Sequence, residues 1–220
     1  MSSSTKLITL NSHTLSACIQ ASKRCIQSGG VIAVPTDTVY GVASSLASAE
    51  RLYEVKGRTK TKPLALCVGD ITEIKTWAHT TVPETLMDDL LPGPVTLVFE
   101  RTRALSTAFN PTTNLVGIRI PAHEFMRELC RQCGEPLALT SANISDTRST
   151  LTVDEFRLLW PKLDLVVDGG QLADTALSRE GSTVVDLSKA GTYRIIRPGS
   201  ALKETVKILA SSKYNLREMS

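Results

Sequence analysis

The chain has 220 residues, enough for one ordinary domain with a buried core, and it is 42% hydrophobic and 21% charged. This composition is typical of a globular protein and argues against a disordered one. The formal net charge of +3 permits an anionic partner without identifying one, and the absence of any apolar run near the roughly 20 residues that span a bilayer predicts a protein with no membrane association.

Short apolar runs alternate with helical patterns along the chain, which favours an α/β or interleaved α+β fold. Amphipathic periodicity and end signals predict helices at 15–26, 48–58, 83–91, 123–132, 152–160 and 201–210. Apolar runs bounded by turn residues predict strands at 31–34, 63–68, 95–100, 115–120, 136–140, 164–168, 182–187 and 193–197.

We expect a single domain over residues 13–210, with tails at 1–12 and 211–220. The last two predicted strands flank a turn at 189–192 and indicate a hairpin, so the sheet is expected to be mixed. Residues 146–150 and 169–181 are expected to be long loops, which often carry function.

The first 36 residues contain no Asp or Glu but do contain Lys6, Lys23 and Arg24, a weak resemblance to a mitochondrial presequence. A surface helix after a short tail is the favoured interpretation. A cytoplasmic protein is therefore expected, with a mitochondrial pool left open.

Five cysteines in a chain without a secretory signal favour reduced thiols. Cys130 and Cys133 form a CxxC near the end of a predicted helix that Gly134 can cap. No second Cys or His pair lies nearby at zinc spacing, so half-buried apolar roles are favoured over metal or redox chemistry.

Polar side chains lie within or beside the ends of several predicted strands. They are Thr36, Asp37, Thr38 and Tyr40 after the first strand, Thr140, Ser141 and Asn143 in LALTSAN, Ser182 and Thr183 beside Gly181, and Arg194 and Arg197 in the last strand. Ligand clefts form at strand ends in open α/β sheets, so we expect these groups to converge. Helix capping by the hydroxyls and a surface position for Arg197 remain alternatives.

Arg119 lies inside the apolar run VGIRIP. A nearly buried guanidinium needs an anionic partner, which is either an internal carboxylate or a carboxylate on a ligand.

The stretch KGRTKTK at 56–62 places four cations directly before a predicted core strand. It is a solvated helix end, a grip for a polyanion such as RNA, or a loop that closes on a small charged substrate. The chain has no GxxxxGK[ST], GxSxG or HExxH motif, and no GxGxxG after a strand. What remains is a site of hydroxyls, amides and cations, which suits the stabilisation of anions.

The ordered blocks GGVIAVPTDTVYG, KGRTKTKPLALCVG, LLPGPVTLV, VGIRIP, LALTSAN, LVVDGG, GSTVVDL and IIRPG closely resemble the YrdC family of threonylcarbamoyl-AMP synthases, in its short animal form. The resemblance implies a single α/β domain built on a twisted mixed sheet flanked by helices, with a cationic concave face. It also implies that L-threonine, bicarbonate and ATP are joined with release of pyrophosphate, with Mg²⁺ accompanying ATP and no tightly bound organic cofactor.

The resemblance also assigns roles by motif. Lys56 and Arg58 would be catalytic, and ATP would contact Lys56, Arg58, Lys62, Ser141, Asn143, Arg197 and, more weakly, Arg148. Threonine would contact Thr38, Arg119, Thr140 and Ser182, with Arg119 taking its carboxylate as a bidentate fork. No metal ligand and no role for Lys60 are implied. Cys67 stands where many microbial members have a His that contacts threonine, which makes that local contact uncertain.

The family's product is used by a tRNA-modifying transferase complex, which is the downstream partner that the resemblance implies, together with weak RNA binding. A double-stranded RNA or tRNA-binding module without turnover is the alternative, because the same cationic loop could contact phosphates. Aromatic residues make up only 5% of the chain, and no RRM-like stacking platform is present, which disfavours it. A threonine or nucleotide sensor without turnover is a third possibility that only product formation excludes.

Overall fold

The structure is a computed structural model that describes residues 5–173 and 179–219. Residues 1–4 and 220 of the predicted tails, and residues 174–178 of the predicted loop at 169–181, lie outside the described residues.

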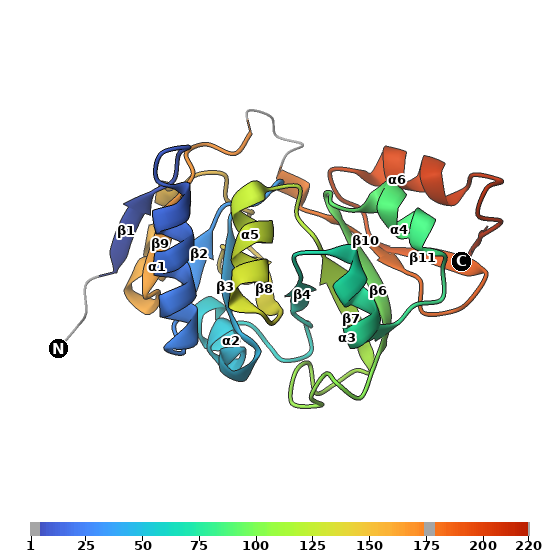
Figure 1. Cartoon of the computed structure of the whole chain (residues 1–220), viewed down its shortest axis with the longest axis horizontal. Coiled ribbons are helices and arrows are strands. Elements are labelled where there is room, and N and C mark those ends of the chain that lie inside the picture. The colour runs from blue at the N-terminus through green and yellow to red at the C-terminus, as the bar shows by residue number, and fades with distance from the viewer. Residues whose placement is uncertain (1–4, 174–178, 220) are drawn as a thin grey trace.

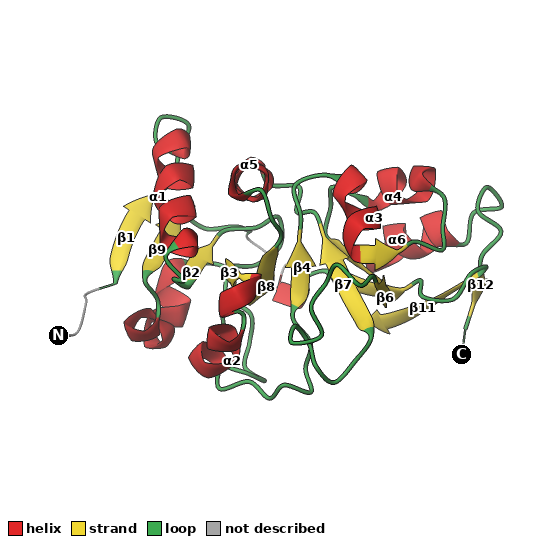
Figure 2. Ribbon diagram, turned by 60° about the horizontal axis from the view of Figure 1, so that its bottom comes forward, coloured by secondary structure: helices red, strands yellow, loops and turns green. Residues whose placement is uncertain are grey.

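The described residues form one mixed twelve-stranded sheet with helices on both faces (Figures 1 and 2). The strands are β1 (Lys6–Thr9), β2 (Ile32–Val34), β3 (Gly41–Ser45), β4 (Ala65–Cys67), β5 (Ala78–His79), β6 (Val95–Arg101), β7 (Leu115–Arg119), β8 (Leu137–Ser141), β9 (Leu165–Asp168), β10 (Thr183–Asp186), β11 (Thr192–Arg197) and β12 (Arg217–Glu218). Their order across the sheet is β1-β9-β2-β3-β8-β4-β7-β6-β10-β11-β12, with β5 paired to β6.

The helices pack in two groups. They are α1 (Leu15–Gln27), α2 (Glu50–Lys56), α3 (Ile74–Trp77), α4 (Glu84–Leu90), α5 (Glu124–Cys133) and α6 (Leu202–Leu209), with the 3₁₀ helices η1 (Leu46–Ser48), η2 (Ile71–Glu73) and η3 (Val153–Lys162). Apolar residues of α1 and α5 share one core cluster with one face of β2, β3, β8 and β9. Apolar residues of α2, α3, α4, α6 and η3 share a second cluster with the opposite face of the sheet.

Most of the predicted elements are confirmed, because their end signals are local. Helices α2 and α5 end at Gly57 and Gly134, whose φ angles of 59° and 74° are the left-handed values that glycine adopts without strain. Strands β10 and β11 pair antiparallel on either side of the predicted turn, and β10 also pairs parallel with β6. The mixed sheet that this hairpin predicted is therefore confirmed.

Several elements differ from the sequence prediction. Strand β3 and the short elements α3 and β5 were not predicted at all. Lys6–Thr9, in the segment predicted as a tail, forms β1 and pairs parallel with β9; Arg217–Glu218, in the other predicted tail, pairs with β11. The predicted helix at 152–160 is a 3₁₀ helix, since Phe156 leaves helical geometry (φ −120°, ψ 27°) and Pro161 lies inside the segment. These short polar or interrupted segments carry weak periodicity, which explains the misses.

Within residues 5–173 and 179–219, no helix combines the length and the apolar character needed to cross a membrane.

Candidate active site

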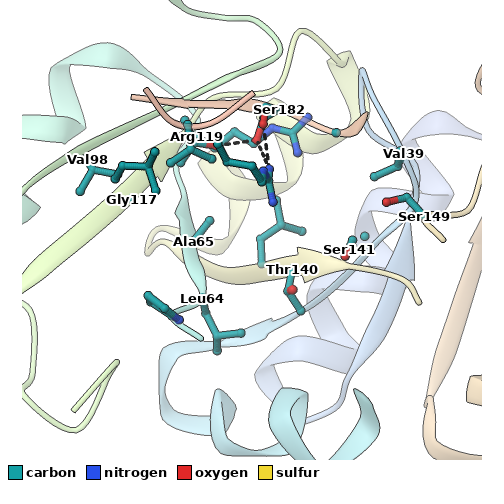
Figure 3. A pocket seen from close by; sticks show the side chains of 18 of the residues that line it. Val39, Leu64, Ala65, Val98, Gly117, Arg119, Thr140, Ser141, Ser149 and Ser182 are labelled. Atoms are coloured by element: carbon teal, nitrogen blue, oxygen red, sulfur yellow. Dashed lines mark hydrogen bonds between the residues drawn. The ribbon is translucent and has the colours of Figure 1, made fainter. Parts of the chain in front are cut away.

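A pocket of about 380 Å³, a size within the range of small-molecule sites, lies on one face of the sheet (Figure 3). Helix α5 packs on the same face, since the lining residue Leu139 belongs to the same apolar cluster as residues of α5. The floor of the pocket is a row of small and apolar side chains in register across four strands. Leu139 pairs with Ala65, Ala65 with Gly117, and Gly117 with Val98. All four line the pocket, so β8, β4, β7 and β6 together build the floor on which polar groups are mounted.

Three guanidinium groups from distant parts of the chain line this pocket: those of Arg58, Arg119 and Arg197. The pKa of Arg197 is lowered, first by burial and then by the positive charges of Arg119 and Arg58. Burial also lowers the pKa of Arg58. The pocket therefore concentrates positive charge over an apolar floor, a setting in which an anion is strongly favoured.

Ser182, just before β10, contacts the start of β6. Its Oγ lies 2.8 Å from Thr96 Oγ1, and Arg197 Nη2 donates to the Ser182 carbonyl at 2.8 Å and to its Oγ at 3.2 Å. Gly199 permits this packing, because a Cβ there would lie 2.4 Å from the Ser182 carbonyl carbon and the Thr183 nitrogen. The hydroxyl of Ser182 is thus held at the pocket wall next to Arg119 (Figure 3).

Arg119 has an internal carboxylate partner. Its Nη2 donates to Asp37 Oδ1 at 2.5 Å and to Thr38 Oγ1 at 2.6 Å, and the side chains of Arg119 and Asp37 are each only 8% exposed. Of the two partners that the sequence left open, the internal one is therefore present, while Arg119 still lines the pocket. Thr38 is buried behind the guanidinium and is not among the lining residues.

Lys56 is 1% exposed and does not line the pocket. Its ammonium donates to the Ser141 carbonyl oxygen, to Ser141 Oγ at 3.2 Å and to Asn143 Oδ1 at 3.3 Å. None of these acceptors is charged, and burial, followed by the charge of Arg58, lowers the pKa of Lys56 to about 7. Lys56 thus supports the Ser141–Asn143 segment from beneath.

The other cations of the loop at 56–62 differ in their surroundings. Arg58 folds back onto its own loop, donating from Nε to the Lys62 carbonyl at 2.9 Å and from Nη2 to the Pro63 carbonyl at 3.0 Å. Lys62 forms an ion pair with Asp146, and the exposed Lys60 pairs with Glu50 at 2.6 Å. The loop is therefore held in place by internal acceptors.

The structure brings six of the predicted site residues to one pocket: Arg58, Arg119, Thr140, Ser141, Ser182 and Arg197. Lys56, Asn143 and Thr38 lie buried directly behind lining residues. Lys62 stands beside the pocket with Asp146, and Arg148 is exposed on the following loop.

Cys67 lies away from the pocket. It is fully buried beneath α5, with its Sγ 3.6 Å from the Sγ of Cys130. Cys67, whose contact with threonine was uncertain from the sequence, is therefore a core residue and does not line the pocket. Cys133, the other half of the CxxC, is half-buried, and its pKa is raised to about 11 by burial.

Sequence reasoning missed several polar lining residues: Thr61, Thr96, Thr112, Thr113, Ser149 and Glu180. Thr96 sits inside an apolar strand, and its alternation with Val95 and Leu97 on the other face is the one signal that could have found it. The others lie on loops whose path depends on tertiary contacts. One such contact joins Arg179 of the 169–181 loop to Glu155, with the Arg179 Nη1 also 2.8 Å from the Ser149 carbonyl.

The chain is similar to known proteins in both sequence and fold. The sequence model of the Sua5, YciO and YrdC proteins, described as "Telomere recombination", matches residues 24–199. The chain is 54% identical to the threonylcarbamoyl-AMP synthase of Bos taurus over 84% of this chain and 68% of that protein, and 52% identical to that of Homo sapiens over 87% and 70%. The structure of Pyrococcus abyssi Sua5 complexed with L-threonine is similar with a TM-score of 0.84 and 27% identity, covering 98% of this chain and 63% of that one.

Proposed function

The chain belongs to the Sua5/YciO/YrdC family and has the activity of its threonylcarbamoyl-AMP synthases, and we propose that the pocket lined by Arg58, Arg119 and Arg197 is where the reaction takes place. In this reaction L-threonine, bicarbonate and ATP give threonylcarbamoyl-adenylate, pyrophosphate and water. The threonine nitrogen bonds to the bicarbonate carbon as a C–O bond breaks and water leaves. A carbamate oxygen then bonds to the α-phosphorus of ATP as pyrophosphate leaves.

The convergence of three guanidinium groups on one pocket carries this proposal. The attacking carbamate and the triphosphate are both anions, so their mutual repulsion is the main barrier to bringing them together. Preorganised cations offset that repulsion without a covalent nucleophile. The hydroxyls of Thr140, Ser141 and Ser182 on the same walls add neutral donors and acceptors that can orient the substrates.

We assign the threonine end of the pocket to Arg119 and its neighbours Thr38, Thr140 and Ser182. Arg119 is the cation that Thr38 contacts directly, and Ser182 lies beside it on the pocket wall (Figure 3). A guanidinium is a planar donor suited to a carboxylate. The α-carboxylate of threonine is the group that this end would bind.

We assign the nucleotide end to Arg58, Ser141 and Arg197, with Lys62 and Arg148 at its rim. Arg58 and Lys62 are held by internal oxygens that a triphosphate could replace. Asn143 and Lys56 act from behind Ser141 in this arrangement. For Lys56 to contact a phosphate, its ammonium would have to leave the carbonyl oxygen of Ser141.

The residues present fit a Mg²⁺ that arrives with ATP. Within the part of the chain that the structure describes, no three Asp, Glu, His or Cys side chains are placed to hold a metal ion, and Glu180 is the acidic residue among those that line the pocket. Mg²⁺ commonly takes one or two carboxylates together with phosphates and water. When bound, it would neutralise part of the phosphate charge, and Glu180 is the lining carboxylate that could contact it.

We further propose that the unstable adenylate passes to a tRNA-modifying transferase complex in the cytoplasm, with a mitochondrial pool as the alternative compartment. RNA binding by this chain is expected to be weak. Two lysines of its cationic loop, Lys60 and Lys62, already pair with carboxylates, which reduces the charge that the loop offers to a polyanion.

The test is a pyrophosphate-release assay with ATP, Mg²⁺ and bicarbonate, in the presence and absence of threonine. Threonine-dependent release together with formation of the adenylate supports the synthase and excludes a sensor without turnover. Release that ignores threonine contradicts it. Calorimetric ATP binding beside a salt titration of tRNA binding addresses the RNA-binding module, which requires tight RNA binding with feeble ATP binding.

A further inference from the structure

Asp37 is a buried carboxylate that uses both of its oxygens. Oδ1 accepts from Arg119 Nη2 at 2.5 Å, and Oδ2 accepts from the backbone N–H of Ala122 at 2.9 Å. Its side chain is 8% exposed, and it is not among the residues that line the pocket. Asp37 therefore faces the protein side of Arg119, away from the substrates.

These contacts join three separate parts of the fold. Asp37 follows β2, Arg119 is the last residue of β7, and Ala122 lies just before α5. In the sheet, β3, β8 and β4 stand between β2 and β7. Asp37 thus ties the guanidinium to a backbone position that is not part of its own strand, which fixes the orientation of the side chain as well as neutralising it.

The guanidinium of Arg119 is only partly used by the protein. Its hydrogen bonds within the described residues, to Asp37, Thr38 and, at 3.4 Å, Thr36, all start from Nη2. Its Nε is buried and has no partner among those residues. One arm of the fork is therefore anchored, and Nη1, which has no partner among the described residues and is not among the buried atoms, is the donor left for a ligand in the pocket.

We propose that Asp37 is the positioning residue of Arg119: it holds one arm of the guanidinium so that the other arm, Nη1, meets the carboxylate of threonine. This rests on the proposed function, in which Arg119 binds that carboxylate. A long side chain loses conformational freedom when it grips a ligand, and a preformed anchor supplies that ordering before threonine arrives. The same anchor compensates a cation that is otherwise buried without a counter-charge.

A double-mutant cycle of Asp37→Asn, Arg119→Gln and the double variant tests this proposal, with KM for threonine and KM for ATP measured separately and folding checked by thermal unfolding. Asparagine keeps the shape of Asp37 but removes its charge and one acceptor. We expect Asp37→Asn to raise KM for threonine by about tenfold or more, the size of a lost charged hydrogen bond, and to leave KM for ATP nearly unchanged. In the Arg119→Gln background the Asp37→Asn change should add nothing, because its effect passes through Arg119.

Arg119→Lys is a second test that keeps the buried ion pair and so protects the fold. A single ammonium bound to Asp37 cannot also present a fork to threonine, so KM for threonine should again rise at least about tenfold while KM for ATP stays near that of the wild type. A wild-type threonine KM in Asp37→Asn or in Arg119→Lys overturns the proposal.

These variants distinguish a failure of the positioning role of Asp37 from a failure of the threonine assignment of Arg119. If the wild type shows threonine-dependent turnover and Arg119→Gln raises KM for threonine but Asp37→Asn does not, the positioning role alone is wrong. If Arg119→Gln itself leaves KM for threonine unchanged, the threonine assignment of Arg119 is wrong and the positioning role falls with it.

Discussion

The ammonium of Lys56 is bonded to both the carbonyl oxygen and the hydroxyl of Ser141. Lys56 ends α2 and Ser141 ends β8, so this contact joins a helix and a strand that are 85 residues apart in sequence. It places a buried cation under a residue that lines the pocket. The energetic consequence can be measured, because the charge of Lys56 depends on pH.

Replacing Lys56 by Met should change how stability depends on pH. The pKa of Lys56 is about 7 in the folded protein and near the ordinary value of 10.5 in the unfolded chain. Between these values the unfolded chain binds a proton that the folded protein does not, so the free energy of unfolding rises with pH. From pH 6.5 to 8.5 the wild type should gain about 1–3 kcal/mol relative to Lys56→Met.

Urea unfolding at several pH values between 6.5 and 8.5 measures this difference. Lys60→Met is the matched control, since Lys60 is exposed and the pKa of its ammonium is raised by Glu50, outside this window. Parallel pH curves for the wild type and Lys56→Met would show that Lys56 keeps its charge in the folded protein.

Arg58→Ala should lower the rate of threonine-dependent pyrophosphate release by about 10²–10³-fold, the usual effect of removing one preorganised charge from a reacting centre. The fold should survive, because the described hydrogen bonds of Arg58 go only to Lys62 and Pro63 of its own loop. Lys60→Ala, on the same loop but absent from the pocket lining, should stay within about twofold of the wild type. Equal losses in both variants would indicate a general effect of loop charge.

Asp146→Asn should lower KM for ATP about two- to fivefold, because Asp146 pairs with Lys62 and a phosphate must compete with that ion pair. Both side chains are substantially exposed, so the effect should shrink as the salt concentration rises. Glu50→Gln removes the partner of Lys60 and serves as the control, with no change in KM for ATP expected. A higher KM in Asp146→Asn would mean that this ion pair positions Lys62 for ATP instead of competing for it.

Cys67→Ala should leave KM for threonine unchanged and lower the free energy of unfolding by about 1 kcal/mol. The thiol is fully buried against Cys130 and lies outside the pocket lining. Substrate kinetics together with urea unfolding separate the two effects. A raised KM for threonine at unchanged stability would indicate that Cys67 takes part in threonine binding.

The sequence alone determined most of the helices and many of the strands, because their signals are local. Gly57 and Gly134 stop their helices through left-handed backbone angles that need no tertiary context. The polar residues after β2 and β8, and Arg119 at the end of β7, were identifiable because an apolar run breaks there. The ordered motifs likewise identified the family before any geometry was known.

Only the tertiary structure decided which of these polar groups face the pocket. Lys56 and Arg58 are two residues apart, yet the first is buried beneath Ser141 and the second lines the cavity, because the chain reverses at Gly57 between them. The sequence allowed either a ligand or an internal carboxylate as the partner of Arg119, and the fold brings Asp37 to it across three intervening strands. Burial and partners depend on long-range register, which no local pattern encodes.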